Sequence, residues 1–212
     1  MKNFIPAFGL LFLSIAVSGQ QIAKTLIAAN SQLVGFLEYK PVDYNVDLTI
    51  KYPLIIFLHG MGERGNGTSQ IWSVANNAIP KYINAGHPMR FFWNGKWETF
   101  LVLSPQLSTT YFDWVNFYTE EMIKYAKANL RIDTNRIIVT GLSLGGGGAW
   151  RYATSSLSNA QQLAAVAPVC GTCSGVTYNN IATANLPLWA FHALDDGVVG
   201  AGCTTSQVAA VE

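Results

Sequence analysis

Charged residues are scarce in this 212-residue chain, at 12% of the total, and the 13 basic side chains nearly cancel the 12 acidic ones. Proteins that bind nucleic acid or an acidic membrane surface carry a clustered basic excess, so neither partner is predicted. Half of the residues are hydrophobic, which is enough for one globular domain with a sizeable core. This composition does not favour disorder.

Long apolar runs are missing as well, except for one at the amino terminus, Phe4–Val17. This run follows the charged start M-K-N and precedes small residues, an order typical of a secretory signal peptide. It is short for a membrane span, so no stable membrane insertion is predicted. We expect residues 1–19 to be a signal peptide cleaved near Gly19, residues 20–212 to be the folded domain, and the protein to be secreted or periplasmic. A retained anchor is the less favoured alternative.

Histidine and cysteine are rare too, with three of each. The C-x-x-C spacing of Cys170 and Cys173 lacks a thioredoxin-like context. A structural zinc ion would need two more Cys or His ligands at suitable spacing, which the sequence does not offer. We expect no metal or organic cofactor, and in an oxidising compartment one structural disulfide with one thiol left over. The pairing among these two cysteines and Cys203 stays open.

The strongest motif is G-x-S-x-G at residues 141–145, with Ser143 at its centre. The β-branched run Arg136–Val139 precedes it and a helical stretch follows. In that context the pattern is the nucleophile elbow, a tight turn that exposes the serine hydroxyl, and small neighbours keep the turn free of Cβ clashes. The amino end of the next helix offers free N–H groups to a developing oxyanion, so Ser143 is predicted to be a nucleophile.

Glycine-rich sequences of this kind also have other roles. A P-loop requires a Lys-Ser/Thr pair after its glycines, and none follows here. The dinucleotide fingerprint requires a glycine where Ser143 stands. An ordinary glycine-rich turn before a helix stays possible on this motif alone.

Strands and helices are predicted to alternate along the chain. Strands are expected at Leu33–Lys40, Val46–Ile50, Tyr52–Leu58, Phe100–Ser104, Arg136–Val139, Leu163–Val169 and Leu186–Phe191, and helices at Thr68–Ala85, Asp113–Leu130 and Ala149–Ser156. Pro80 should kink or split the first helix, and Asp113 should cap the second. This alternation predicts a mostly parallel sheet covered by helices on both faces.

Two further segments bear on a site. The strand Tyr52–Leu58 ends in H-G-M-G-E-R-G, and such a turn can bring a second N–H to an oxyanion. We expect His59 to brace this loop rather than to act in catalysis, and Glu63 to pair with Arg64. The aromatic segment Phe91–Trp97 could line a substrate cleft, although partly buried packing is its more common role.

Four stretches together resemble the secreted predicted-peptidase and esterase group of α/β-hydrolases, related to feruloyl and acetyl-xylan esterases, polyhydroxybutyrate depolymerases and prolyl-oligopeptidase-type domains. They are Y-P-L-I-I-F-L-H-G-M-G-E-R-G from Tyr52, L-S-P-Q from Leu103, R-I-I-V-T-G-L-S-L-G-G-G-G-A-W from Arg136, and P-L-W-A-F-H-A-L-D-D-G-V-V from Pro187. Their order and spacing cover most of residues 33–212. The resemblance implies an α/β-hydrolase three-layer sandwich with a mostly parallel sheet.

The resemblance also implies site residues. Ser143 would be the nucleophile, and the backbone N–H groups of Leu144 and Met61 would form the oxyanion hole. The stretch from His192 is similar to the family's H-G-x-x-D-x-x-V-P, whose Asp is the catalytic acid and falls on Asp196.

The acid loop departs from the family pattern in two places. Ala193 replaces the glycine and Gly200 replaces the proline, and Asp195 is a rival for the role of the acid. No histidine follows Asp196, although this fold places its catalytic histidine after the acid. We therefore expect a C-terminally truncated domain that lacks its last strand, its histidine loop and its terminal helix. Such a fragment should be nearly inactive and poorly stable.

The predicted function is that of a secreted serine hydrolase that cleaves carboxylic esters, on small molecules or linked to polysaccharides. Secretion and the aromatic segment suggest plant-polymer esters such as acetylated or feruloylated xylan. A prolyl-oligopeptidase-type peptidase is the nearest alternative, because the same triad cleaves both bonds. A non-catalytic binding module that keeps the hydrolase shape is a third. The oligomeric state is left open.

Overall fold

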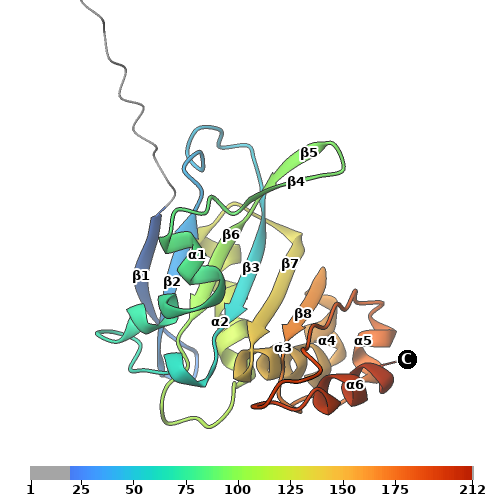
Figure 1. Cartoon of the computed structure of the whole chain (residues 1–212). Helices are drawn as coiled ribbons and strands as arrows, with labels where there is room; N and C mark the ends of the chain where they lie inside the picture. Colours follow the sequence, from blue (N-terminus) through green and yellow to red (C-terminus); the bar gives the residue numbers. More distant parts are fainter. Residues whose placement is uncertain (1–19, 212) are drawn as a thin grey trace, which may run out of the picture.

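A six-stranded sheet forms the centre of the structure, a computed structural model that describes residues 20–211 (Figure 1). Its order is β1-β2-β6-β3-β7-β8. The strands are β1 (Gln20–Ile27), β2 (Leu33–Lys40), β3 (Tyr52–Leu58), β6 (Leu101–Pro105), β7 (Ile132–Leu142) and β8 (Ala165–Val169). The first two strands are antiparallel to their neighbours, and the last four run parallel to one another. The expected signal peptide lies outside the described residues.

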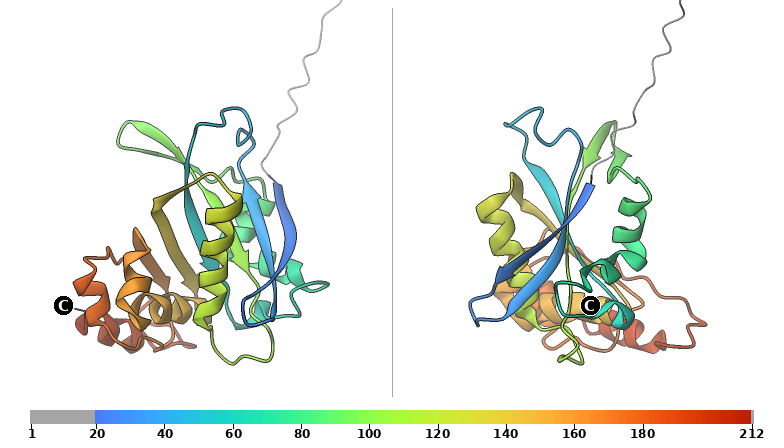
Figure 2. Two further views of the ribbon diagram at one scale, coloured as in Figure 1. Left: turned by 180° about the vertical axis from the view of Figure 1, so that it is seen from behind. Right: turned by 90° about the vertical axis from the view of Figure 1, so that its left-hand side faces the viewer.

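The parallel strands are apolar because helices cover both faces of the sheet. In β3 every residue is buried. Leu54 and Ile56 face the layer that holds α2 (Asn116–Asn129) and α3 (Leu144–Ser155), while Ile55 and Phe57 pack towards α1 (Ala78–Asn84). Figure 2 shows α1 and α2 on opposite sides of the sheet. The predicted three-layer α/β-hydrolase sandwich is confirmed.

Of the two long helices, α2 buries one face against the sheet, whereas α3 is buried along almost its whole length. In α2 that face carries Tyr118, Met122 and Ala126, which recur at the four-residue spacing of a helix. In α3 the fully buried Trp150 is the largest core side chain. The shorter helices are η1 (Met61–Glu63), η2 (Ile71–Asn76), α4 (Leu157–Gln161), α5 (Asn179–Thr183) and α6 (Gly202–Ala209). None of the helices within residues 20–211 is both long and apolar enough to cross a membrane.

The predicted helix Thr68–Ala85 forms as two pieces, η2 and α1, and the break lies at Asn77 instead of Pro80. Asn77 is extended, and its side chain accepts a hydrogen bond from the N–H of Ala78 at 2.9 Å. Pro80 falls in the first turn of α1, where its missing N–H has no helical partner to lose. The cap therefore decides the boundary.

Two other local predictions were wrong, and one strand was missed. Val46–Ile50 forms turns with exposed side chains rather than a strand, and β1 was not predicted because most of its residues are exposed. Asp113 does not cap α2, which begins at Asn116 after Val115. Its carboxylate instead bonds across the fold to Arg151, with Oδ2 and Nη2 2.7 Å apart.

The segment expected as a fifth parallel strand, Leu186–Phe191, runs alongside β8 but pairs only at two isolated bridges, Val166 with Leu188 and Val169 with Phe191. Backbone bonds join Trp189 N to Val166 O at 3.1 Å and Phe191 N to Pro168 O at 3.0 Å. Pro168 has no N–H to donate in return, so the ladder is interrupted in its middle.

The aromatic segment forms a separate hairpin of β4 (Arg90–Trp93) and β5 (Lys96–Thr99), drawn at the top of Figure 1. All four residues of β4 are exposed, and Trp93 keeps 76% of its surface accessible. The hairpin precedes β6 and so lies at the amino ends of the parallel strands. Ser143 follows the carboxyl end of β7, at the opposite edge. These aromatics are neither packed inside nor part of a cleft around Ser143.

Candidate active site

Ser143 lies on a strained turn between β7 and α3. Its backbone angles are φ 56° and ψ −117°, a region that residues with a Cβ rarely adopt. The turn is held on both sides, because Ser143 N donates to Val169 O at 2.9 Å and Ser143 O accepts from Gly147 N at 3.0 Å. The side chain is half-buried, and its hydroxyl makes no hydrogen bond with another residue in 20–211. This is the geometry expected of a nucleophile elbow.

The glycines of the motif are required by close backbone contacts. A Cβ at Gly145 would overlap the carbonyl of Leu58 at the end of β3, and a Cβ at Gly141 would overlap the carbonyl of Gly145. The first turn of α3 therefore rests directly on the neighbouring strand. That contact sets the position of the serine relative to the loop that follows β3.

This loop lies against the elbow. A Cβ built on Gly60 would come within 3.8 Å of the Cβ of Ser143 and 3.6 Å of the carbonyl oxygen of Leu142. Met61 begins η1 directly after Gly60, and Leu144 is the first residue of α3. Within residues 20–211, neither the N–H of Met61 nor that of Leu144 donates a hydrogen bond to a protein acceptor. The two N–H groups expected to hold an oxyanion are thus free beside Ser143.

His59 fixes the direction of one of these N–H groups. Its ring is 1% exposed, Nε2 accepts from the N–H of Leu107 at 2.9 Å, and Nδ1 therefore carries the proton that it donates to the Gly60 carbonyl at 2.6 Å. The Gly60 carbonyl and the Met61 N–H belong to one trans peptide and point in opposite directions. The bond from His59 therefore turns the Met61 N–H away from its ring.

The predicted bracing role of His59 agrees with its surroundings. The Trp114 ring meets His59 edge-on, and Trp114 Nε1 donates to the His59 carbonyl at 3.0 Å. Burial lowers the pKa of His59 to about 4, against a smaller upward effect of the Gly60 carbonyl. The ring is therefore neutral at neutral pH and keeps both hydrogen bonds.

The predicted ion pair between Glu63 and Arg64 was wrong. Arg64 donates instead to two backbone carbonyls, Met61 O at 3.2 Å and Tyr111 O at 2.9 Å. Glu63 turns back towards His59, with Oε2 3.9 Å from Nδ1. Arg64 thus fastens the loop after β3 to the loop after β6, which a local pairing of adjacent charges could not do.

Of the two candidate acids, Asp196 is the ordered one. Its Oδ1 accepts from the N–H groups of Val198 at 2.8 Å and Val199 at 3.0 Å, and these bonds hold the pKa of the carboxyl below its usual range. Asp195 is exposed, and its side chain makes no hydrogen bond within the described chain. The geometry favours Asp196.

No histidine in the described chain bonds to the Ser143 hydroxyl. Both ring nitrogens of His59 are engaged, and so are those of His192, which lie 2.7 Å from Thr204 Oγ1 and 2.7 Å from Val199 O. His87 lies between α1 and β4, at the far end of the sheet.

Cys170 is the site residue that sequence reasoning missed. It follows β8 in a left-handed conformation, with φ 40°, and carries a free thiol, because the disulfide joins Cys173 to Cys203. Burial, with help from the Asp196 charge, raises the pKa of the thiol, and the Ser143 N–H lowers it in part. Cys170 therefore lies close to the backbone of Ser143. Its C-x-x-C spacing drew attention to pairing and gave no sign of this position.

No metal centre can be built from the described chain, since no three His, Cys, Asp or Glu side chains within residues 20–211 group closely enough to hold an ion. The chemistry available at this edge of the sheet is that of a serine hydroxyl, two free backbone N–H groups and a carboxylate.

A sequence comparison agrees with this geometry, because the family described as phospholipase/carboxylesterase matches residues 49–209. The chain belongs to this family of α/β-hydrolases. The match covers the turn at Ser143, the loop after β3 and the loop that carries Asp196. A comparison with curated proteins found no match to this chain.

Solved structures show the same fold. A thermostable esterase is 25% identical, with a TM-score of 0.63 over 90% of this chain. The feruloyl esterase module of Clostridium thermocellum, crystallised with sinapinate, is 18% identical, with a TM-score of 0.66 over 92% of this chain. The acylaminoacyl peptidase of Pyrococcus horikoshii is 12% identical, with a TM-score of 0.58 over 99%. This chain spans 52% of the length of the esterase, 73% of the module and 38% of the peptidase.

Proposed function

We propose that the protein is a serine hydrolase that cleaves carboxylic esters, with Ser143 as its nucleophile. The observation that carries this proposal is the strained turn at Ser143, with the free N–H groups of Leu144 and Met61 beside it. Strain in a residue with a Cβ persists only where the surrounding structure enforces it. A structural turn at this place would not need a serine hydroxyl without a protein partner together with two unused donors.

In the proposed reaction the Ser143 oxygen attacks the acyl carbon of the ester. The carbonyl oxygen becomes an oxyanion that accepts from the N–H groups of Leu144 and Met61, which are already fixed in place. A histidine takes the serine proton and gives it to the leaving alcohol, and Asp196 orients that histidine. Water then hydrolyses the acyl-enzyme by the same steps in reverse order, which releases the acid and restores the serine.

We propose that none of the three histidines in residues 20–211 is the base. His59 and His192 use both ring nitrogens in other hydrogen bonds, and His87 lies at the far end of the sheet. Secretion after removal of residues 1–19 belongs to the same proposal, and the Cys173–Cys203 disulfide fits an oxidising compartment.

Hydrolysis of 4-nitrophenyl acetate by the complete protein tests the nucleophile. Ser143→Ala should lower kcat by about a thousandfold or more, because the covalent step is lost while the oxyanion donors stay. Ser158→Ala, at an exposed serine of α4, is the matched control and should leave turnover unchanged. Unchanged turnover in Ser143→Ala would refute the assignment.

The bond cleaved, ester or peptide, is tested by assaying the same protein on a short acyl ester and on the corresponding peptide amide. We propose the ester, since the phospholipase/carboxylesterase family matches most of the chain. Faster turnover of the amide would favour a peptidase. A folded protein with no turnover of either substrate would favour a binding module.

A further inference from the structure

Asp196 lies in a segment that packing does not hold in place. The chain from His192 to Ala201 has no regular secondary structure, and Leu194 and Val198 in it are 89% and 91% exposed. A catalytic acid must nevertheless be fixed within a fraction of an ångström to orient its histidine. Hydrogen bonds must therefore hold the Asp196 carboxylate in place.

The carboxylate of Asp196 is held from one side only. Oδ1 accepts from Val198 N at 2.8 Å and from Val199 N at 3.0 Å, which closes a tight turn over residues 196–199. Oδ2 accepts no hydrogen bond within the described chain, and His192 Nε2 lies 3.5 Å from it. The orientation of the carboxylate therefore depends on where the backbone of Val199 lies.

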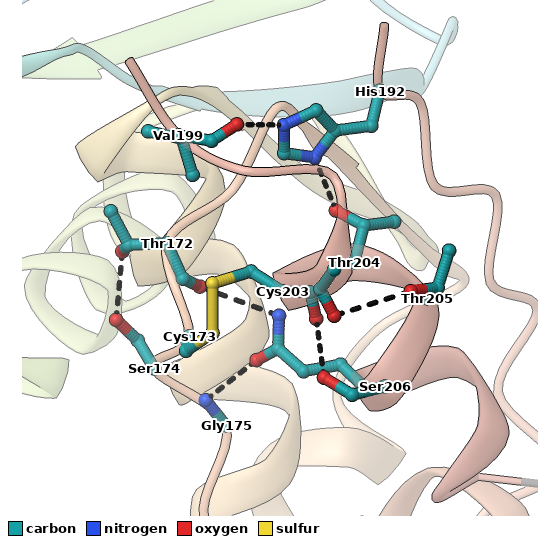
Figure 3. The surroundings of a disulfide bond; sticks show 12 residues. Thr172, Cys173, Ser174, Gly175, His192, Val199, Cys203, Thr204, Thr205 and Ser206 are labelled. Carbon is teal, nitrogen blue, oxygen red and sulfur yellow. Dashed lines mark hydrogen bonds between the residues drawn. A yellow bond between two sulfur atoms is a disulfide. The ribbon is translucent and has the colours of Figure 1, made fainter. Parts of the chain in front are cut away.

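His192 bonds to the carbonyl of Val199, as Figure 3 shows. Its Nε2 lies 2.7 Å from the carbonyl oxygen of Val199, and its Nδ1 lies 2.7 Å from Thr204 Oγ1. A carbonyl only accepts, so Nε2 carries the proton and Nδ1 accepts from the Thr204 hydroxyl. Val199 is thus bonded to Asp196 through its N–H and to His192 through its carbonyl.

The second bond of His192 leads to a fixed support. Thr204 lies in the first turn of α6, next to Cys203, whose disulfide to Cys173 ties α6 to the loop after β8. Gln207 adds bonds to that loop at 2.9 Å and 3.3 Å. The loop packs directly on α3, since a Cβ at Gly171 would come within 2.8 Å of the backbone of Gly146.

We propose that His192 is a positioning residue for Asp196. His192 links α6, which the disulfide anchors, to the backbone of Val199, and Val199 in turn holds the carboxylate of Asp196 in place. His192 does not touch the substrate and does not act as the base in this role. The catalytic consequence rests on the proposed function, but the positioning itself is a property of the folded chain. It can therefore be measured without turnover.

Two substitutions separate the two bonds of His192. Gln places an amide N–H near the position of Nε2, so His192→Gln keeps the donor to Val199 and loses the acceptor for Thr204. Asn places its oxygen near the position of Nδ1, so His192→Asn keeps the contact to Thr204 and loses the donor to Val199. Both variants lack the imidazole ring. Thr205→Val is the control, since that exposed hydroxyl bonds only within α6.

The first readout is the pKa of the Asp196 carboxyl by carbon NMR, with its signal assigned by loss in Asp196→Asn. Its neighbours that titrate are His192 and Cys170. His192→Gln should keep the pKa of the Asp196 carboxyl below its usual range. His192→Asn should raise this pKa, because the hydrogen bonds from Val198 and Val199 weaken. Equal values in the two variants, with both folded by thermal unfolding, would overturn the proposal.

The second readout is ester turnover of the complete protein. His192→Asn should lower kcat by about tenfold to a hundredfold with little change in KM, because a misplaced acid slows chemistry and not binding. His192→Gln should stay within about threefold of the unsubstituted protein. A larger loss in His192→Gln than in His192→Asn would overturn the proposal. If Ser143→Ala keeps its turnover, the proposed function fails, and the NMR result still decides the positioning.

Discussion

His59 should make the fold sensitive to acid. Its ring is buried, neutral and bonded at both nitrogens, to Gly60 and to Leu107. Protonation would put a hydrogen on Nε2, which now accepts from the Leu107 N–H, and would place a charge in the core. The perturbation that isolates this effect is His59→Gln, which removes the titrating group and keeps polar atoms in the same place.

The size of the effect follows from two pKa values. Burial lowers the pKa of His59 from 6.5 in the unfolded chain to about 4 in the folded protein. Between these values the unfolded state binds more protons, so stability is full above pH 6.5 and falls as the pH drops towards about 4. At roughly 1.4 kcal/mol for each unit, the complete loss is about 3 kcal/mol. Glu63, 3.9 Å away, would reduce it.

Urea unfolding followed by tryptophan fluorescence, at pH 7 and at pH 4.5, measures this loss. Other groups titrate alike in both proteins, so they cancel in the difference between the unsubstituted protein and His59→Gln. The free energy of unfolding of the unsubstituted protein, minus that of His59→Gln, should be larger at pH 7 than at pH 4.5. The expected change in this difference is about 2 to 3 kcal/mol. The same difference at both pH values would show that His59 is not a buried neutral ring and would refute the reasoning about the Met61 N–H.

Two further outcomes follow from contacts around the elbow and α6. Gly145→Ala should lower the free energy of unfolding by more than about 3 kcal/mol in the same assay, because its Cβ would overlap the Leu58 carbonyl. Gly200→Ala is the control and should leave this free energy nearly unchanged, because the space around Gly200 is open. The Cys173–Cys203 disulfide spans 30 residues of sequence, so its reduction should lower stability by about 3 to 4 kcal/mol. Thermal unfolding with and without dithiothreitol measures this loss, and replacement of the free Cys170 by Ala should not alter it. A normal Gly145→Ala protein, or an unfolding midpoint unmoved by reduction, would contradict these contacts.

The sequence predicts the parts of this fold that are buried on both faces. The apolar run Tyr52–Leu58 has no other use than as a central strand, and it forms one. Val46–Ile50 has similar residues but lies in an exposed loop, because no neighbouring strand pairs with it. The helix boundary at Asn77 depended on a single side-chain cap. Periodicity gives the elements, while caps and pairing partners set their ends.

The site could be predicted where one short segment contains its own geometry. The glycines around Ser143 are needed by contacts that any such turn makes, so the motif was sufficient to find it. Cys170 was missed because it reaches Ser143 only through the pairing of β7 with β8, 27 residues later in the chain. Asp113 was misread because its bond to Arg151 joins the loop before α2 to α3. Such contacts exist only after the sheet has formed.

Covalent trapping with a fluorophosphonate, followed by mass spectrometry of the digested protein, tests the nucleophile most directly. The complete protein should carry one adduct, on the peptide that contains Ser143, and Ser143→Ala should carry none. An adduct on a different residue of an active protein, or equal labelling of Ser143→Ala, would contradict the account.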